Sequence, residues 1–218
     1  MRGLIFDLVD TLYPRERYVL GGLAAVAQHL ASTRRLASDD VFALLCRAHE
    51  AQPGGALQAG CTRYGLPGAT TSELLAVFRQ HQPALWLAHD AAATLRQLRL
   101  DGWRLAVLTN GLPSVQAHKV ESLRIDRLVD HVVFAEHHAP GGKPHRAPFL
   151  AALARLGVPA GCCVMVGDDA ACDVAGGRNA GLRTIWLDRR GGGVAPADAA
   201  DASVQSLGEV PGAGAALL

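Results

Sequence analysis

Residues 3–12 read Gly-Leu-Ile-Phe-Asp-Leu-Val-Asp-Thr-Leu, a short apolar run that meets its first acidic residue at Asp7. The run 3–9 has the length and apolar content of a buried strand. Four similar runs follow along the chain, at 103–108, 131–135, 162–166 and 182–187. Helical patterns lie between them, at 89–100, 113–122, 146–156 and 170–180. This alternation, with strands apolar on both faces, predicts an α/β fold with a mainly parallel sheet covered by helices on either side.

One long segment, 14–87, contains no convincing strand. Its helical patterns lie at 16–31, 39–50 and 71–80, and Gly- and Pro-rich loops at 53–55 and 65–68 separate them. We therefore predict two domains: a core formed by 1–13 and 88–218, and a helical insertion at 14–87. Ligands of open α/β sheets bind at the carboxyl ends of the strands, so an insertion anchored there is expected to act as a lid.

The C-terminal tail, 191–218, opens with Gly191-Gly-Gly193 and is rich in alanine. A last short strand-like run lies near Ala202. We expect the end of this tail to be loosely held.

Composition bounds the class of protein. The chain has 218 residues, 22.9 kDa and a formal net charge of +1, which suits one α/β domain with an insert and gives no strong field for holding nucleic acid or an anionic membrane. No stretch approaches the roughly 20 apolar residues of a membrane span, and the N-terminus lacks the features of a signal peptide. Five cysteines without a Cys-x-x-Cys pair predict a reducing, cytoplasmic environment. Oligomeric state stays open.

Polar residues follow the apolar runs in a pattern that suggests one shared site. They are Asp7, Thr109, Asn110, Lys143, Asp168, Asp169 and Asp173. A carboxylate directly after a buried strand is costly unless it meets a cation. Three carboxylates around one point need more positive charge than one lysine supplies, and hard oxygen ligands suit Mg²⁺ better than Zn²⁺. A carboxylate nucleophile, a metal, a lysine, and hydroxyl and amide donors are the groups that phosphoryl transfer requires.

Four motifs in this order resemble those of the haloacid dehalogenase superfamily, in its phosphatase-like branch. They are Asp7-Leu-Val-Asp-Thr11 with Leu12, then Leu108-Thr-Asn-Gly111, then Gly142-Lys-Pro144, then Val166-Gly-Asp-Asp169 through Asp173 and Ala180-Gly181. The resemblance covers roughly 1–13 and 88–210. It implies a Rossmann-like core with a C1-type helical cap, and a hydrolase that forms an aspartyl-phosphate on Asp7 from a small phosphorylated metabolite.

The resemblance also implies roles for individual residues. Mg²⁺ would be held by Asp7, the Val9 carbonyl and Asp168, and Asp173 would support the metal site or the lysine. Thr109, with Asn110 beside it, would bind the phosphate, and Lys143 would neutralise it.

One position departs from the family pattern D-x-D-x-T. Val9 stands where the second Asp would protonate the leaving oxygen and later activate water. Asp10 is adjacent, but in an extended segment its side chain is expected to face away from the side of Asp7. General acid–base catalysis is worth about 10²–10⁴-fold, so three interpretations remain: a slow phosphatase, a phosphate-ligand binding protein on the same scaffold, or a reaction that needs no acid there.

The last interpretation has two precedents in the superfamily. The 2-haloacid dehalogenases lack the second Asp but also lose the Gly-Asp pair that Gly167-Asp168 preserves here, so dehalogenation is a minority alternative. The phosphonate-cleaving relatives use a cap lysine, and 14–87 contains none.

Further residues have a structural and a functional interpretation. We predict that Asp169 caps the following helix, that Asp10 is structural, and that Cys162 and Cys163 are core residues. Substrate contacts from the insertion are expected from Arg15, Arg17 and Tyr18 and from the loop at 53–55. His137 and His138 are more typical of ordinary loop residues than of residues that face a substrate.

Overall fold

Six parallel strands form one sheet in the computed structural model, which describes residues 1–189 and 200–218. Their order across the sheet is β3-β2-β1-β4-β5-β6. The strands are β1 (Gly3–Phe6), β2 (Arg104–Thr109), β3 (His131–Phe134), β4 (Cys163–Gly167), β5 (Arg183–Leu187) and β6 (Ala202–Val204). This architecture confirms the predicted α/β fold.

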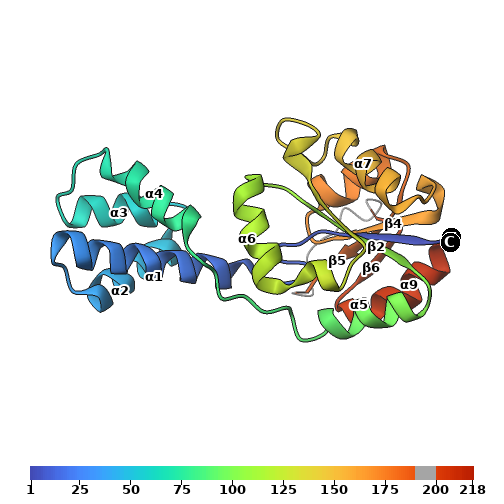
Figure 1. The fold of residues 1–218 in the computed structure, drawn as a ribbon, viewed down its shortest axis with the longest axis horizontal. Coiled ribbons are helices and arrows are strands. Elements are labelled where there is room, and N and C mark those ends of the chain that lie inside the picture. Colours follow the sequence, from blue (N-terminus) through green and yellow to red (C-terminus); the bar gives the residue numbers. More distant parts are fainter. Residues whose placement is uncertain (190–199) are drawn as a thin grey trace. The chain divides into compact units, whose positions relative to one another are not determined.

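Helices cover both faces of the sheet (Figure 1). They are α5 (Ala91–Leu100), α6 (Pro113–Leu123), α7 (Arg146–Leu156), α8 (Gly176–Asn179) and α9 (Val210–Leu217). On one face, Ile5, Leu108 and Met165 pack against Phe149 of α7 in a fully buried cluster. On the other face lie α5 and α9. Because both faces are covered, all four residues of β1 are buried, which explains the uninterrupted apolar run in the sequence.

The contacts divide the chain into two units, Met1–Pro14 with Trp86–Leu218, and Arg15–Leu85. The second unit is purely helical among its described residues. Its helices are α1 (Arg15–Arg34), α2 (Ser38–Ala51), α3 (Ala56–Arg63) and α4 (Thr70–Gln80). They pack around a core of their own that includes Leu23, Leu45 and Leu74. The short helix α3, which follows Pro53-Gly-Gly55, has no counterpart among the predicted patterns.

The C-terminal end differs from the expectation. After β6, a short helical turn and α9 follow, and Leu207 and Val210 are fully buried. Trp103 lies close to Gly214 of α9. The prediction of a loosely held end is therefore wrong, because a few apolar residues in an alanine-rich tail suffice to dock it. The Gly191–Gly193 stretch lies outside the described residues.

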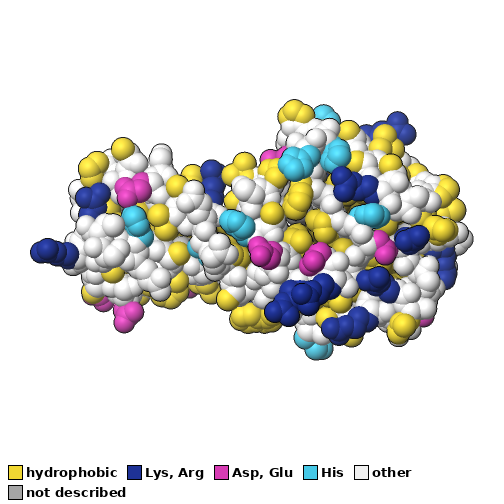
Figure 2. Space-filling model, viewed as in Figure 1, with side chains coloured by type: hydrophobic (Ala, Val, Ile, Leu, Met, Phe, Trp, Pro, Cys, Tyr) yellow, Lys and Arg dark blue, Asp and Glu magenta, His cyan; other side chains and the backbone are white. Residues whose placement is uncertain are grey.

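Charged side chains are unevenly distributed on the surface of the described residues. Basic side chains group around α5 on the visible face, and acidic side chains are scattered singly (Figure 2). No described helix has both the length and the apolar character of a membrane span.

Candidate active site

The site lies where the order of the strands reverses. The chain passes from β1 outward to β2 and β3, then crosses back to β4 on the other side of β1 and continues outward to β5 and β6. A crevice opens outside the carboxyl ends of the strands at such a point. Asp7 directly follows β1, Asp168 directly follows β4, and Thr109 is the last residue of β2. The backbone N–H of Asp7 donates to the Val166 carbonyl at 2.9 Å, which ties the start of the loop to β4.

Lys143 is the centre of the polar contacts. Its Nζ donates to Asp7 Oδ1 at 2.6 Å, to Asp173 Oδ1 at 2.6 Å and to the Leu108 carbonyl at 3.0 Å. An ammonium group has three protons, so all of its donors are used. The predicted meeting of a lysine with Asp7 and Asp173 is what the structure shows.

The backbone of Lys143 is held by Asn110. Asn110 Nδ2 donates to the Lys143 carbonyl at 2.9 Å, and the Lys143 N–H donates to Asn110 Oδ1 at 2.7 Å. Gly142 adopts φ +65°, and a Cβ there would overlap Asn110 Oδ1. The Asn110 side chain therefore positions Lys143. The direct donation to phosphate that we expected of Asn110 stays a prediction, with one amide proton left for it.

Asp173 is the most buried carboxylate of the group, at 1% exposure. It lies in a π-helical segment, η4 (Ala170–Ala175), where the sequence predicted the start of an α-helix. Its Oδ2 accepts from the Asp169 N–H at 3.2 Å. Gly167 has no room for a Cβ, which would overlap the Asp173 side chain.

Asp169 has the capping role predicted for it. Its Oδ1 accepts from the N–H groups of Ala171 at 2.9 Å and Cys172 at 2.8 Å, at the start of η4. This carboxylate is therefore engaged by the backbone.

Asp168 is held by two residues to which we assigned no role. Thr11 Oγ1 donates to Asp168 Oδ1 at 2.9 Å, and Trp186 Nε1 donates to the Asp168 carbonyl at 2.9 Å. Thr11 stands in the first motif, and Trp186 lies next to the end of β5. Position at the carboxyl end of a predicted strand was the available signal for Trp186.

The carboxylates are crowded and short of positive charge. Asp7, Asp168 and Asp173 each offer one oxygen, and these oxygens lie within 4.8 Å of one another. Burial, and then the charge of Asp7, raises the pKa of Asp168 to about 6. Burial also raises the pKa of Asp173, although Lys143 opposes that shift. Burial alone would lower the pKa of Lys143, but Asp7 and Asp173 outweigh it and raise that pKa.

The charge balance fits a divalent cation. Three carboxylates against one ammonium leave two uncompensated negative charges. The pKa of Asp168 is raised by burial first and then by the negative charge of Asp7. All the offered ligands are carboxylate oxygens, the donors that Mg²⁺ prefers. The residues present therefore suit Mg²⁺, with Asp7 and Asp168 as the carboxylates that Lys143 does not fully occupy.

Thr109 is fully buried and contacts a residue that the sequence analysis missed. Gln116 Nε2, from α6, donates to Thr109 Oγ1 at 2.8 Å and also to the Asn110 carbonyl. Gln116 is 3% exposed, and its Oε1 has no hydrogen-bond partner among the described residues. A single glutamine in a helical pattern offered no signal for this role.

We expected the Asp10 side chain to face away from Asp7 because we assumed an extended backbone at Asp10. That assumption is wrong. Strand β1 ends at Phe6, and Asp10 lies in a turn with φ +64°. The backbone N–H of Asp10 donates to the Tyr13 carbonyl at 2.8 Å. Asp10 and Asp168 line the same pocket of about 450 Å³, together with Trp186. The charge of Asp10 also raises the pKa of Asp168, so Asp10 lies on the side of the carboxylates. Val9 is half-buried, and its carbonyl as a metal ligand stays a prediction.

The residues proposed for substrate contact belong to the helical unit. Arg15 is exposed, Arg17 is half-buried, and Tyr18 is buried with its ring 5.7 Å from Phe78 and 4.7 Å from His81. Tyr18 therefore packs within its own unit. A substrate contact from these three residues stays a prediction.

Two histidines and two cysteines differ in burial. His137 and His138 are exposed. Cys163 is fully buried in β4, as predicted for a core residue, whereas Cys162 is exposed, so that part of the prediction is wrong.

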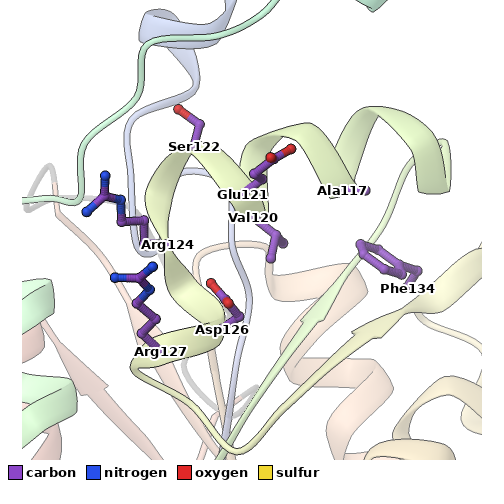
Figure 3. Close-up of a pocket in the computed structure, with 8 residues that line it drawn as sticks. All are labelled: Ala117, Val120, Glu121, Ser122, Arg124, Asp126, Arg127 and Phe134. Atoms are coloured by element: carbon purple, nitrogen blue, oxygen red, sulfur yellow. The ribbon is translucent and has the colours of Figure 1, made fainter.

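A second pocket, of about 630 Å³, lies along α6 and shares none of these residues. Arg124, Arg127 and Asp126 line it on one side, and Phe134 lines it on the opposite side (Figure 3). Its mixed charges do not suggest one ligand class.

The family model for haloacid dehalogenase-like hydrolases matches residues 1–181. A ribulose-1,5-bisphosphate 5-phosphatase of Halopiger xanaduensis is 30% identical over 231 residues, which covers 95% of this chain and 96% of that protein. The human N-acylneuraminate-9-phosphatase is 40% identical over 106 residues, 48% of this chain and 42% of that protein, so this match spans less than half of the relative's length.

Among solved structures, a magnesium-bound HAD hydrolase of Bacillus subtilis has a TM-score of 0.69. It is 19% identical, and the match covers 97% of each chain. At this identity the similarity concerns the fold.

Proposed function

The chain belongs to the haloacid dehalogenase-like hydrolase family, and we propose that it is a Mg²⁺-dependent phosphatase of a small phosphorylated metabolite. The observation that carries this proposal is the cluster of three carboxylate oxygens within 4.8 Å of one another around a single buried lysine. The phosphatase activities of the Halopiger and human relatives support it.

Asp7 is the proposed nucleophile. One of its oxygens accepts from Lys143, which restrains the carboxylate and leaves the second oxygen for attack on phosphorus. A bond from this oxygen to phosphorus forms as the bond to the leaving oxygen breaks, and water then cleaves the aspartyl-phosphate to release inorganic phosphate.

Mg²⁺ bound by Asp7 and Asp168, with the Val9 carbonyl as a further ligand, would supply positive charge to the transferring phosphoryl group. The chain's own residues hold the site: Thr11 and Trp186 orient Asp168, and Asn110 and Asp173 orient Lys143. Thr109 would donate to a phosphate oxygen, and Lys143 would neutralise the group.

Val9 determines how fast this reaction can run. Its hydrocarbon side chain cannot protonate a leaving oxygen, and a positioned acid is worth about 10²–10⁴-fold. We therefore propose a slow enzyme that favours substrates whose leaving oxygen needs little protonation. The same residue favours the second candidate, a phosphate-ligand binding protein on this scaffold. A 2-haloacid dehalogenase without metal would leave the three carboxylates with Lys143 as their one compensating cation among the described residues.

The decisive experiment measures inorganic phosphate released from a panel of phosphate esters, with Mg²⁺ and with a chelator. We expect slow, Mg²⁺-dependent release that Asp7→Asn abolishes and that Asp101→Asn, an exposed acidic control, leaves unchanged. Phosphate binding without release would support the binding protein. Metal-independent halide release from a 2-haloacid, without phosphate release, would overturn the proposal.

A further inference from the structure

We propose that Gln116 is a positioning residue that determines the direction in which the Thr109 hydroxyl donates its proton, and thereby prepares Thr109 to bind a phosphate oxygen. This inference rests on the proposed function, because it concerns how the same site recognises phosphate. It starts from the hydrogen bonds between α6 and the end of β2.

The orientation of the Gln116 amide is determined by its neighbours. Nitrogen and oxygen of a glutamine side chain are distinguished by the network around them. The same Gln116 atom lies against the Asn110 carbonyl oxygen and Thr109 Oγ1. A backbone carbonyl only accepts, so the atom that faces it must be the NH₂ group, and its two protons serve these two oxygens.

Thr109 Oγ1 therefore accepts from Gln116, at 2.8 Å. Its own proton must point elsewhere, and no acceptor within the described ranges, 1–189 and 200–218, receives it. Thr109 is fully buried at the carboxyl end of β2, beside the Leu108 carbonyl that accepts from Lys143. A buried donor without an acceptor is unfavourable by itself, and an oxygen of a bound anion would satisfy it.

This arrangement leaves the oxygen atom of the Gln116 amide in an unfavourable position. Gln116 Oε1 is buried and has no hydrogen-bond partner among the residues that the structure describes. A flipped amide would give Oε1 the Thr109 proton but would set it against the Asn110 carbonyl, oxygen to oxygen. The observed orientation thus leaves an acceptor unsatisfied and keeps the Thr109 proton available for a ligand.

The helix makes this contact possible. Gln116 lies on the first turn of α6, which begins at Pro113 a few residues after β2. At 3% exposure the side chain has little room to turn away. The backbone carbonyl of Asn110 accepts the second amide proton of Gln116, and the Asn110 side chain holds the Lys143 backbone. Gln116 therefore contacts Thr109 directly and supports Lys143 through Asn110.

The test is a double-mutant cycle read by inorganic phosphate affinity in the presence of Mg²⁺, using calorimetry on the full chain. Gln116→Met keeps the length of the side chain and removes the donor, and Thr109→Val removes the hydroxyl. We expect each to weaken phosphate binding about tenfold or more, and the double variant to bind no more weakly than Thr109→Val alone. Gln97→Met, an exposed glutamine of α5, is the matched control and should bind as the wild type does.

A merely structural role for Gln116 predicts a different result, namely an equal further loss in the Thr109→Val background. That additivity, or wild-type affinity in Gln116→Met, overturns the inference. Should Gln116→Met fail to fold, Thr109→Ser and Thr109→Val decide: the serine variant should keep most of the affinity, and wild-type affinity in the valine variant overturns the inference.

The two proposals fail in distinguishable ways. Wild-type protein that neither binds phosphate nor releases it from esters overturns the proposed function, and this inference with it. Wild-type protein that binds phosphate while the cycle shows no coupling overturns this inference alone.

Discussion

The carboxylate of Asp173 accepts a hydrogen bond of 2.6 Å from the ammonium of Lys143, and both side chains are almost fully buried. Water does not reach either charged group, so the two charges compensate each other. Removal of one partner of a buried pair is far more costly than removal of both.

Lys143→Met is therefore expected to lower the free energy of unfolding by about 3–5 kcal/mol near neutral pH. The loss should shrink near pH 5, because Asp173 can then become protonated. Urea denaturation at both pH values measures it. The double variant Lys143→Met/Asp173→Asn is the matched comparison and should recover much of the loss. Equal stability of the single and double variants would contradict this account.

Magnesium binding should strengthen as pH rises through the titration of Asp168. Its pKa is raised from 3.8 to about 6, so between these values the folded protein holds a proton that the unfolded chain has released. Without Mg²⁺, stability therefore falls as pH rises through that window. Because Mg²⁺ binds the deprotonated carboxylate, its effect on Tm should be small near pH 5 and several degrees near pH 7.5.

Asp168→Asn should remove both the pH dependence and the Mg²⁺ effect on Tm. Asp101→Asn, at an exposed position, should remove neither. A Mg²⁺ effect that does not change between about pH 5 and 7.5 would argue against binding by Asp168.

Gly167→Ala tests the support of Lys143 by Asp173. A Cβ at Gly167 would overlap the Asp173 side chain, so Asp173 must move and Lys143 loses a partner. We expect a fall of about tenfold or more in kcat, with a loss of roughly 1–3 kcal/mol in stability from overpacking. Gly161→Ala, in the short helical turn that precedes β4, has open space around its Cβ and should change neither. Normal turnover in Gly167→Ala would contradict the proposed support.

Val9→Asp should reveal which step limits the reaction. A carboxylic acid at this position is expected to raise kcat/KM on an alkyl phosphate by about 10²–10⁴-fold. An aryl phosphate has a leaving oxygen that needs little protonation, so its gain should be much smaller. Val9→Asn has similar size but no transferable proton and should stay slow. Equal rates in Val9→Asp and the wild type on alkyl phosphate would mean that another residue supplies the proton.

Local pattern was sufficient to identify the scaffold. Apolar runs such as 3–9 and 182–187, with breakers beside them, mark strands because burial on both faces of a parallel sheet tolerates few polar residues. The capping role of Asp169 could also be predicted from local sequence, because a cap accepts from N–H groups only two and three residues away. The turn at Asp10 could not be predicted, because a turn changes the direction of a side chain without changing the composition of the sequence.

By itself, the sequence determined which polar residues follow the strands, directly or in the next loop or turn, and hence that Asp7, Lys143, Asp168 and Asp173 would share one rim. Only the tertiary structure decided how they are held. Lys143 and Asp7 are 136 residues apart, and the partners of Asn110, Gln116 and Trp186 depend on strand register and helix placement that no local pattern contains. Such contacts arise when the sheet assembles, because the register of parallel strands brings distant chain segments within hydrogen-bond distance.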